Sequence, residues 1–136
     1  MRNILISITL IAILISGCTV NLWTMLPPIQ PVDLVSEGDA AHGAELFTKG
    51  AHEAPPCSSC HTLGDSTFSL GPKLTGVYER AGKREPDLTA EAYLYESITE
   101  PGAYVVSGYR DIMYPHYAEK LSQQEIADLI AYLMTL

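Results

Sequence analysis

Apolar residues recur at helical spacing near the C-terminal end of the sequence. Ser122 and Glu125 stand three residues apart, as in a capping box, where each side chain bonds the backbone amide of the other residue. The apolar stripe that follows consists of Ile126, Leu129, Ile130 and Leu133. This spacing predicts a helix that buries one face.

Two earlier segments carry helix start and stop signals. Asp39 can cap a helix that ends at Gly50, and Thr89 can cap one that ends before Pro101. The residues expected on the buried faces are Ala40, Gly43, Ala44 and Phe47 in the first helix, and Leu94 and Ile98 in the second. No long segment alternates between apolar and polar residues. The pattern therefore predicts an all-α domain with three main helices, joined by loops rich in glycine and proline.

Charge is distributed unevenly along the 136 residues. The chain has 8 Lys and Arg residues and 16 Asp and Glu residues, and only Arg2 among them precedes Asp33. The first part is therefore a charge-poor head, and the rest is an acidic domain of about 100 residues, enough for one small core. These proportions exclude a multidomain enzyme and a polytopic membrane protein. The net charge of -8 also argues against nucleic-acid binding, which needs clustered basic residues.

The head resembles a bacterial lipoprotein signal peptide. Arg2 is followed by an apolar run from Ile4 to Ile15 and then by Ser-Gly and Cys18. In that family the segment before the cysteine is removed, which implies that residues 1–17 are cleaved off and that Cys18 is acylated. The alternative is an uncleaved anchor, because Ile4 to Leu26 is long enough to span a bilayer. Both interpretations place the domain at the periplasmic face of a bacterial membrane.

The segment 18–38 has the composition of a linker. It contains three prolines and no apolar periodicity, which is typical of a semi-rigid connection between an anchor and a domain. The sequence thus divides into a signal peptide at 1–17, a lipid-anchored linker at 18–38 and a folded domain at 39–136.

The two remaining cysteines form a closely spaced pair. Cys57 and Cys60 are followed directly by His61, in the Cys-x-x-Cys-His arrangement of covalent haem attachment. Two thiols on one turn can bond the two vinyl groups of a porphyrin, while the adjacent histidine ligates the iron. A thioredoxin-like redox pair would need a preceding strand, and a structural zinc site would need a fourth ligand. Neither is visible in the sequence, so haem is the favoured interpretation.

Several motifs beyond this pair make residues 39–136 resemble a class I cytochrome c of the small mitochondrial and bacterial respiratory type. Gly43 and Phe47 match the first helix of that family, and Tyr132 matches the aromatic residue of its last helix. The segment from Gly71 to Gly76, with Arg80 behind it, matches the family pattern Gly-Pro-x-Leu-x-Gly-x-x-x-Arg. The resemblance implies a small fold in which three main helices and their loops wrap around one covalently bound haem c.

The resemblance also implies individual roles. Both cysteines of the attachment motif form thioethers, and His61 is the proximal iron ligand. The Pro72 carbonyl accepts a hydrogen bond from that histidine, and Arg80 faces a haem propionate. Met113 is the distal ligand, which stabilises reduced iron and closes the sixth position.

One departure from the family lies beside the distal ligand. Relatives usually have a proline directly after the methionine, whereas Tyr114 separates Met113 from Pro115 here. The loop is therefore expected to hold the sulfur less firmly. His116 is an alternative ligand, which would give a bis-histidine haem. Met134 is expected to fill the core instead.

A haem that is capped on both faces exchanges electrons and has no open position for a substrate. The resemblance therefore implies an electron-transfer protein rather than an enzyme, tethered to the membrane and carrying single electrons between redox partners of a respiratory or photosynthetic chain. It would act as a free carrier or as a subunit of a quinol-oxidising complex such as alternative complex III. Removal of residues 1–17 takes away Arg2 and changes the net charge from -8 to -9, so we expect docking on basic partner surfaces. The alternative is a haem sensor or a peroxidase-like enzyme in which Met113 leaves the iron.

Overall fold

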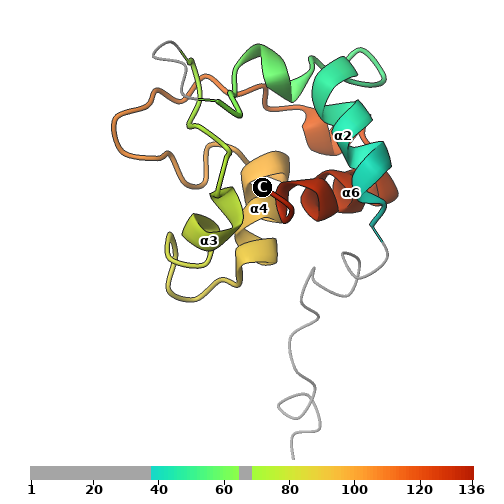
Figure 1. The fold of residues 1–136 in the computed structure, drawn as a ribbon. Coiled ribbons are helices and arrows are strands. Elements are labelled where there is room, and N and C mark those ends of the chain that lie inside the picture. The colour runs from blue at the N-terminus through green and yellow to red at the C-terminus, as the bar shows by residue number, and fades with distance from the viewer. Residues whose placement is uncertain (1–37, 65–68) are drawn as a thin grey trace, which may run out of the picture.

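The computed structural model describes residues 38–64 and 69–136 (Figure 1). The predicted signal peptide at 1–17, Cys18 and all of the predicted linker except Gly38 lie outside the described residues. The elements are α2 (Ala40–Lys49), the 3-10 helix η3 (Cys57–Ser59), α3 (Val77–Ala81), α4 (Ala90–Thr99), α5 (Tyr117–Lys120) and α6 (Gln123–Leu133). The described part contains one isolated β-bridge and no strand, so the all-α prediction is confirmed.

The three capped helices form where the sequence predicts them. The Asp39 side chain accepts a hydrogen bond from the Ala41 amide at 2.8 Å, and α2 stops at Gly50, whose φ is +70°. The Thr89 hydroxyl accepts from the Ala92 amide and starts α4, and Ser122 and Glu125 form the capping box of α6. Each boundary is set by side chains within a few residues of the helix end.

Two short helices, α3 and α5, are not predicted by the sequence pattern. The residue before α3 is Gly76, which has a left-handed conformation with a φ of +68°. Helix α5 has only four residues and places Tyr117 in the core. Helices of one turn have no apolar period to recognise, and they are stabilised by the tertiary contacts that bury them.

Helices α2 and α6 cross at close range and form one side of the molecule (Figure 1). Gly43 makes this crossing possible, because a Cβ at that position would lie 2.9 Å from Cβ of Tyr132 and would overlap the Asp128 backbone carbonyl. One turn later, the Phe47 ring packs against the Tyr132 ring, with their centroids 5.5 Å apart. The contact between these two helices, as expected from the family resemblance, closes one side of the core.

The predicted buried faces are confirmed for α4 and α6 and are partly wrong for α2. Leu94, Ile98 and the four apolar residues of α6 are buried. In α2, however, Ala40 and Ala44 are only partly buried, and Leu46, which we did not expect in the core, is 7% exposed. Leu46 lies three residues after Gly43 and directly before Phe47, so it shares the buried face of α2 and packs in the core cluster.

Helix α3 lies beside α4, across the core from α2 (Figure 1). The long loop between α4 and α5 returns along the open side, so the helices surround a central space. Among the described residues, no helix combines the length and the apolar character that crossing a bilayer requires.

Candidate functional site

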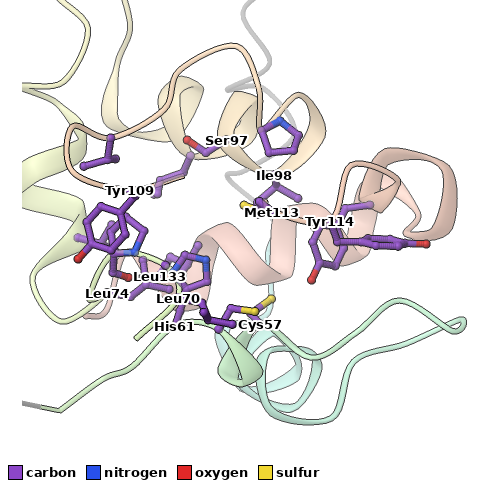
Figure 2. Close-up of a pocket in the computed structure, with 18 of the residues that line it drawn as sticks. Cys57, His61, Leu70, Leu74, Ser97, Ile98, Tyr109, Met113, Tyr114 and Leu133 are labelled. Carbon is purple, nitrogen blue, oxygen red and sulfur yellow. Dashed lines mark hydrogen bonds between the residues drawn. The ribbon is translucent and has the colours of Figure 1, made fainter. Parts of the chain in front are cut away.

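A cavity of about 490 Å³ opens between the helices. Figure 2 shows its walls: Cys57 and His61 come from η3 and the residues after it, Ser97 and Ile98 from α4, and Met113 and Tyr114 from the loop before α5. Most of the lining is aliphatic or aromatic, and it includes five of the eight tyrosines. These are Tyr93, Tyr104, Tyr109, Tyr114 and Tyr117. A cavity of this size and character suits a largely apolar group of the size of a cofactor.

The Cys-x-x-Cys-His motif forms a single tight turn on the cavity wall. The Cys60 amide donates to the Cys57 carbonyl at 3.1 Å, and the His61 amide donates to the same carbonyl at 2.9 Å. Both cysteines are free and both line the cavity. Burial raises the pKa of the Cys57 thiol to about 11. A thiol with a raised pKa is unlike the reactive thiolate of a thioredoxin-like pair, so the redox-motif alternative is disfavoured.

The imidazole of His61 is oriented by the segment that starts at Gly71. Its Nδ1 lies 2.8 Å from the Pro72 carbonyl, which can only accept, so Nδ1 carries the proton and Nε2 keeps its lone pair. The family resemblance implies Pro72 as the partner of His61, and the structure brings this carbonyl and the imidazole together. A histidine fixed in this tautomer is ready to ligate a metal through Nε2.

Gly71 has a role that the sequence analysis missed. A Cβ on this residue would come within 2.7 Å of Nδ1 and 2.9 Å of Nε2 of His61, so the ring lies flat against the glycine backbone. Any side chain here would displace the imidazole. The signal was present in the first glycine of the Gly-Pro-x-Leu-x-Gly segment, but the contact joins residues ten positions apart.

Met113 lines the same cavity as His61 and packs against the core. The alternative ligand His116 does not line it: its side chain is 53% exposed and its Nδ1 pairs with Glu119 at 3.0 Å. Met134 packs against the core outside the cavity lining. Among the described residues, His61 and Met113 are therefore the one histidine and the one methionine that border the cavity. Their assignment as iron ligands remains a prediction.

Arg80 lines the cavity from α3. Its guanidinium donates to the Lys73 carbonyl at 2.6 Å and to the Thr75 carbonyl at 2.7 Å. These bonds tie the segment after Pro72 to α3 and hold the guanidinium in the wall. The predicted contact of Arg80 with a haem propionate is compatible with this position and stays a prediction.

The residues around the cavity fit a haem group attached through the motif. Two thiols, an imidazole and a thioether border one space whose remaining wall is mainly apolar. In the described part of the chain, no group of three or more His, Cys, Asp or Glu residues is arranged to hold a bare metal ion. A structural zinc site therefore does not fit these residues.

A comparison with curated proteins found no match to this sequence. The family model for cytochrome c, in contrast, matches residues 40–136, which include all the helices described above and every residue of the cavity. Proteins of this family carry haem c bound covalently, and a domain with one attachment motif holds one such group. The chain belongs to the cytochrome c family and is a haem-based electron-transfer protein.

Proposed function

We propose that this protein is a lipid-tethered cytochrome c that carries single electrons between redox proteins at the periplasmic face of a bacterial membrane. One observation supports the electron-transfer role: of the described residues, one histidine and one methionine border the haem cavity, while His116 and Met134 lie outside its lining. This pair would hold the iron through an imidazole and a thioether. The protein would then exchange electrons without binding a substrate.

Each residue of the site has a distinct task in this proposal. Bound haem c supplies a one-electron Fe(III)/Fe(II) couple, and Cys57 and Cys60 hold it covalently. His61, whose Nδ1 bonds the Pro72 carbonyl, would ligate the iron through Nε2. The Met113 thioether would be the second ligand, which would favour the reduced state and exclude small ligands.

The membrane anchor is proposed from the sequence. Acylation of Cys18 would attach the domain through the linker 18–38, which keeps it at high effective concentration near membrane partners. Weak and fast encounters then suffice for electron transfer. Mass spectrometry of the mature protein tests this step: a chain that begins with acylated Cys18 is expected, and a chain that retains Met1 would contradict it.

The electron-transfer role is tested on the purified holoprotein by optical spectroscopy in both oxidation states. We expect a six-coordinate haem c that cycles reversibly and does not bind carbon monoxide in the reduced state at neutral pH. Carbon monoxide binding would instead favour the haem sensor or peroxidase-like alternative, because it requires Met113 to leave the iron. A colourless protein would overturn the haem assignment itself.

The carrier and the fixed subunit are two forms of the same function. We favour the carrier, because one small tethered domain can reach separate donors and acceptors. Extraction with a mild detergent distinguishes the two forms. A monomer is expected for a carrier, whereas stable co-purification with a quinol-oxidising complex would show that the protein is a subunit.

A further inference from the structure

Basic side chains are concentrated on the wall of the haem cavity, although the chain as a whole is acidic. Among the residues that the structure describes, four basic residues line the cavity, against one acidic residue, Asp111. The basic residues are Lys73, Arg80, Arg84 and Arg110. A haem group brings two carboxylates of its own as propionates. Carboxylates at the edge of an apolar cavity require cationic or hydrogen-bonding partners on its wall.

Arg84 differs from Arg80 in its bonding. Arg80 uses two of its five N–H donors on backbone carbonyls, as described above. Arg84 lies one turn further along the chain and is partly buried in the wall. No hydrogen bond or ion pair joins its guanidinium to another described residue. The N–H donors of this partly buried guanidinium are therefore available to a carboxylate inside the cavity.

The surroundings of Arg84 place its charge toward the cavity. Burial raises the pKa of the Tyr93 phenol, and the nearby charge of Arg84 opposes that rise. Tyr93 belongs to α4 and lines the cavity itself. Glu85, the residue after Arg84, acts on the same phenol in the opposite direction. Because Arg84 and Tyr93 both line the cavity, the charge of Arg84 reaches the cavity wall.

The neighbouring basic residues are less suited to the same task. Lys83 is exposed and does not line the cavity. Arg110 does line it, but its side chain is exposed and the next residue, Asp111, brings the opposite charge to the same wall. Of Lys83, Arg84 and Arg110, only Arg84 is partly buried.

We propose that Arg84 binds a haem propionate, and that Arg84 and Arg80 together neutralise the charged edge of the haem. The role is one of binding and electrostatic tuning. A guanidinium suits it, because its planar fork matches a carboxylate in bidentate geometry. The proposal depends on the haem that the family membership implies, and it does not depend on any redox partner.

Two effects follow from such a contact. A cation close to the haem opposes the extra positive charge of Fe(III), so removing it should lower the ratio of reduced to oxidised protein at a fixed applied potential about three- to tenfold. The same cation keeps the propionate pKa low. Without the Arg84 cation the propionate pKa rises. As the pH falls through this raised pKa, the propionate takes up a proton and loses its negative charge. We therefore expect the ratio of reduced to oxidised protein to change further with pH over this range.

The test is redox titration of the purified holoprotein between pH 5 and pH 9, without partners. Arg84→Gln is compared with Lys83→Gln and Arg110→Gln, which remove the same charge from nearby positions. In Arg84→Gln we expect the ratio of reduced to oxidised protein to drop about three- to tenfold and to gain a new dependence on pH. In the Lys83→Gln control the ratio should change less than about twofold, because solvent screens the charge of Lys83.

A ratio and pH profile of Arg84→Gln that match those of Lys83→Gln would overturn the proposal. The same effects in Arg110→Gln instead would assign the contact to the wrong arginine and would also overturn it. If Arg84→Gln does not incorporate haem, Arg84→Lys is measured: it keeps the charge but lacks the fork, so about a twofold drop in the same direction is expected. A ratio equal to that of the wild type would then count against the proposal.

Discussion

Substitution of Gly71 by alanine tests how the fold positions the proximal histidine. The added methyl group would lie 2.7 Å from Nδ1 and 2.9 Å from Nε2 of His61, closer than carbon and nitrogen atoms can approach without bonding. The ring would have to move, and its 2.8 Å contact with the Pro72 carbonyl would stretch or break.

The cost can be derived from these contacts. Overpacking a well-filled site costs about 1–3 kcal/mol, and loss of a neutral hydrogen bond adds about 0.5–1.5 kcal/mol. Replacing glycine restricts the unfolded chain and returns about 0.4–1 kcal/mol. We therefore expect Gly71→Ala to lower the free energy of unfolding by about 0.5–4 kcal/mol, with a central value of about 2 kcal/mol. The haem spectrum should also change, because the histidine that we propose as a ligand is displaced.

Gly64→Ala is the matched control. Apart from its chain neighbours, no described residue has an atom within 4 Å of a Cβ at Gly64, so the same substitution there should leave the protein equally stable or slightly more stable. Denaturant unfolding of both holoproteins gives the free energies, and optical spectra report the ligation. If Gly71→Ala is as stable as Gly64→Ala and has an unchanged spectrum, the proposed packing of His61 against Gly71 is wrong.

Three further predictions concern the helices around the cavity. His42 Nδ1 donates a hydrogen bond to the Asp128 carboxylate, which raises the pKa of His42. The contribution of this pair to stability is therefore fully present below the ordinary value of 6.5 and is lost as the pH rises through the folded-state pKa. The stability difference between wild type and His42→Gln should therefore be larger at pH 6 than at pH 8.5 in urea unfolding, and an equal difference would contradict this. Burial raises the pKa of Asp128, but bonds from His42 and the Asp39 amide reverse that effect and lower it. Its contribution should persist above the unfolded-state pKa and disappear as the pH falls below about 4, an acid limb that Asp128→Asn should lack. Phe47 is 1% exposed, and Phe47→Ala should cost about 3–5 kcal/mol in the same assay, whereas a loss below 1 kcal/mol would show that the contact between α2 and α6 is not central.

The sequence predicts those parts of the fold that depend on neighbouring residues. The caps at Asp39, Thr89 and Ser122 satisfy backbone groups two or three positions away, so both the signal and the structure are local. The buried stripe of α6 follows from helical periodicity in the same way. Gly43 could be assigned only through the family resemblance, because its contact with α6 joins residues far apart in the chain.

Other features depend on three-dimensional contacts that no local pattern carries. Helices α3 and α5 are single turns, so no apolar period marks them in the sequence. For the site, the attachment motif identifies Cys57 and His61 directly, since the chemistry requires that spacing. The roles of Gly71 and Arg84 depend on which side chains meet at the cavity wall, and that becomes visible only when the chain is folded.

His61 and Met113 border one cavity, and we propose that together they ligate the haem iron. The methionine-to-iron charge-transfer band of the oxidised holoprotein, recorded for Met113→Ala and for His116→Ala, tests this assignment. We expect the band to disappear in Met113→Ala and to persist in His116→Ala, whose imidazole pairs with Glu119 outside the cavity lining. Persistence of the band in Met113→Ala, or a wild-type protein with a bis-histidine spectrum that His116→Ala abolishes, would contradict it.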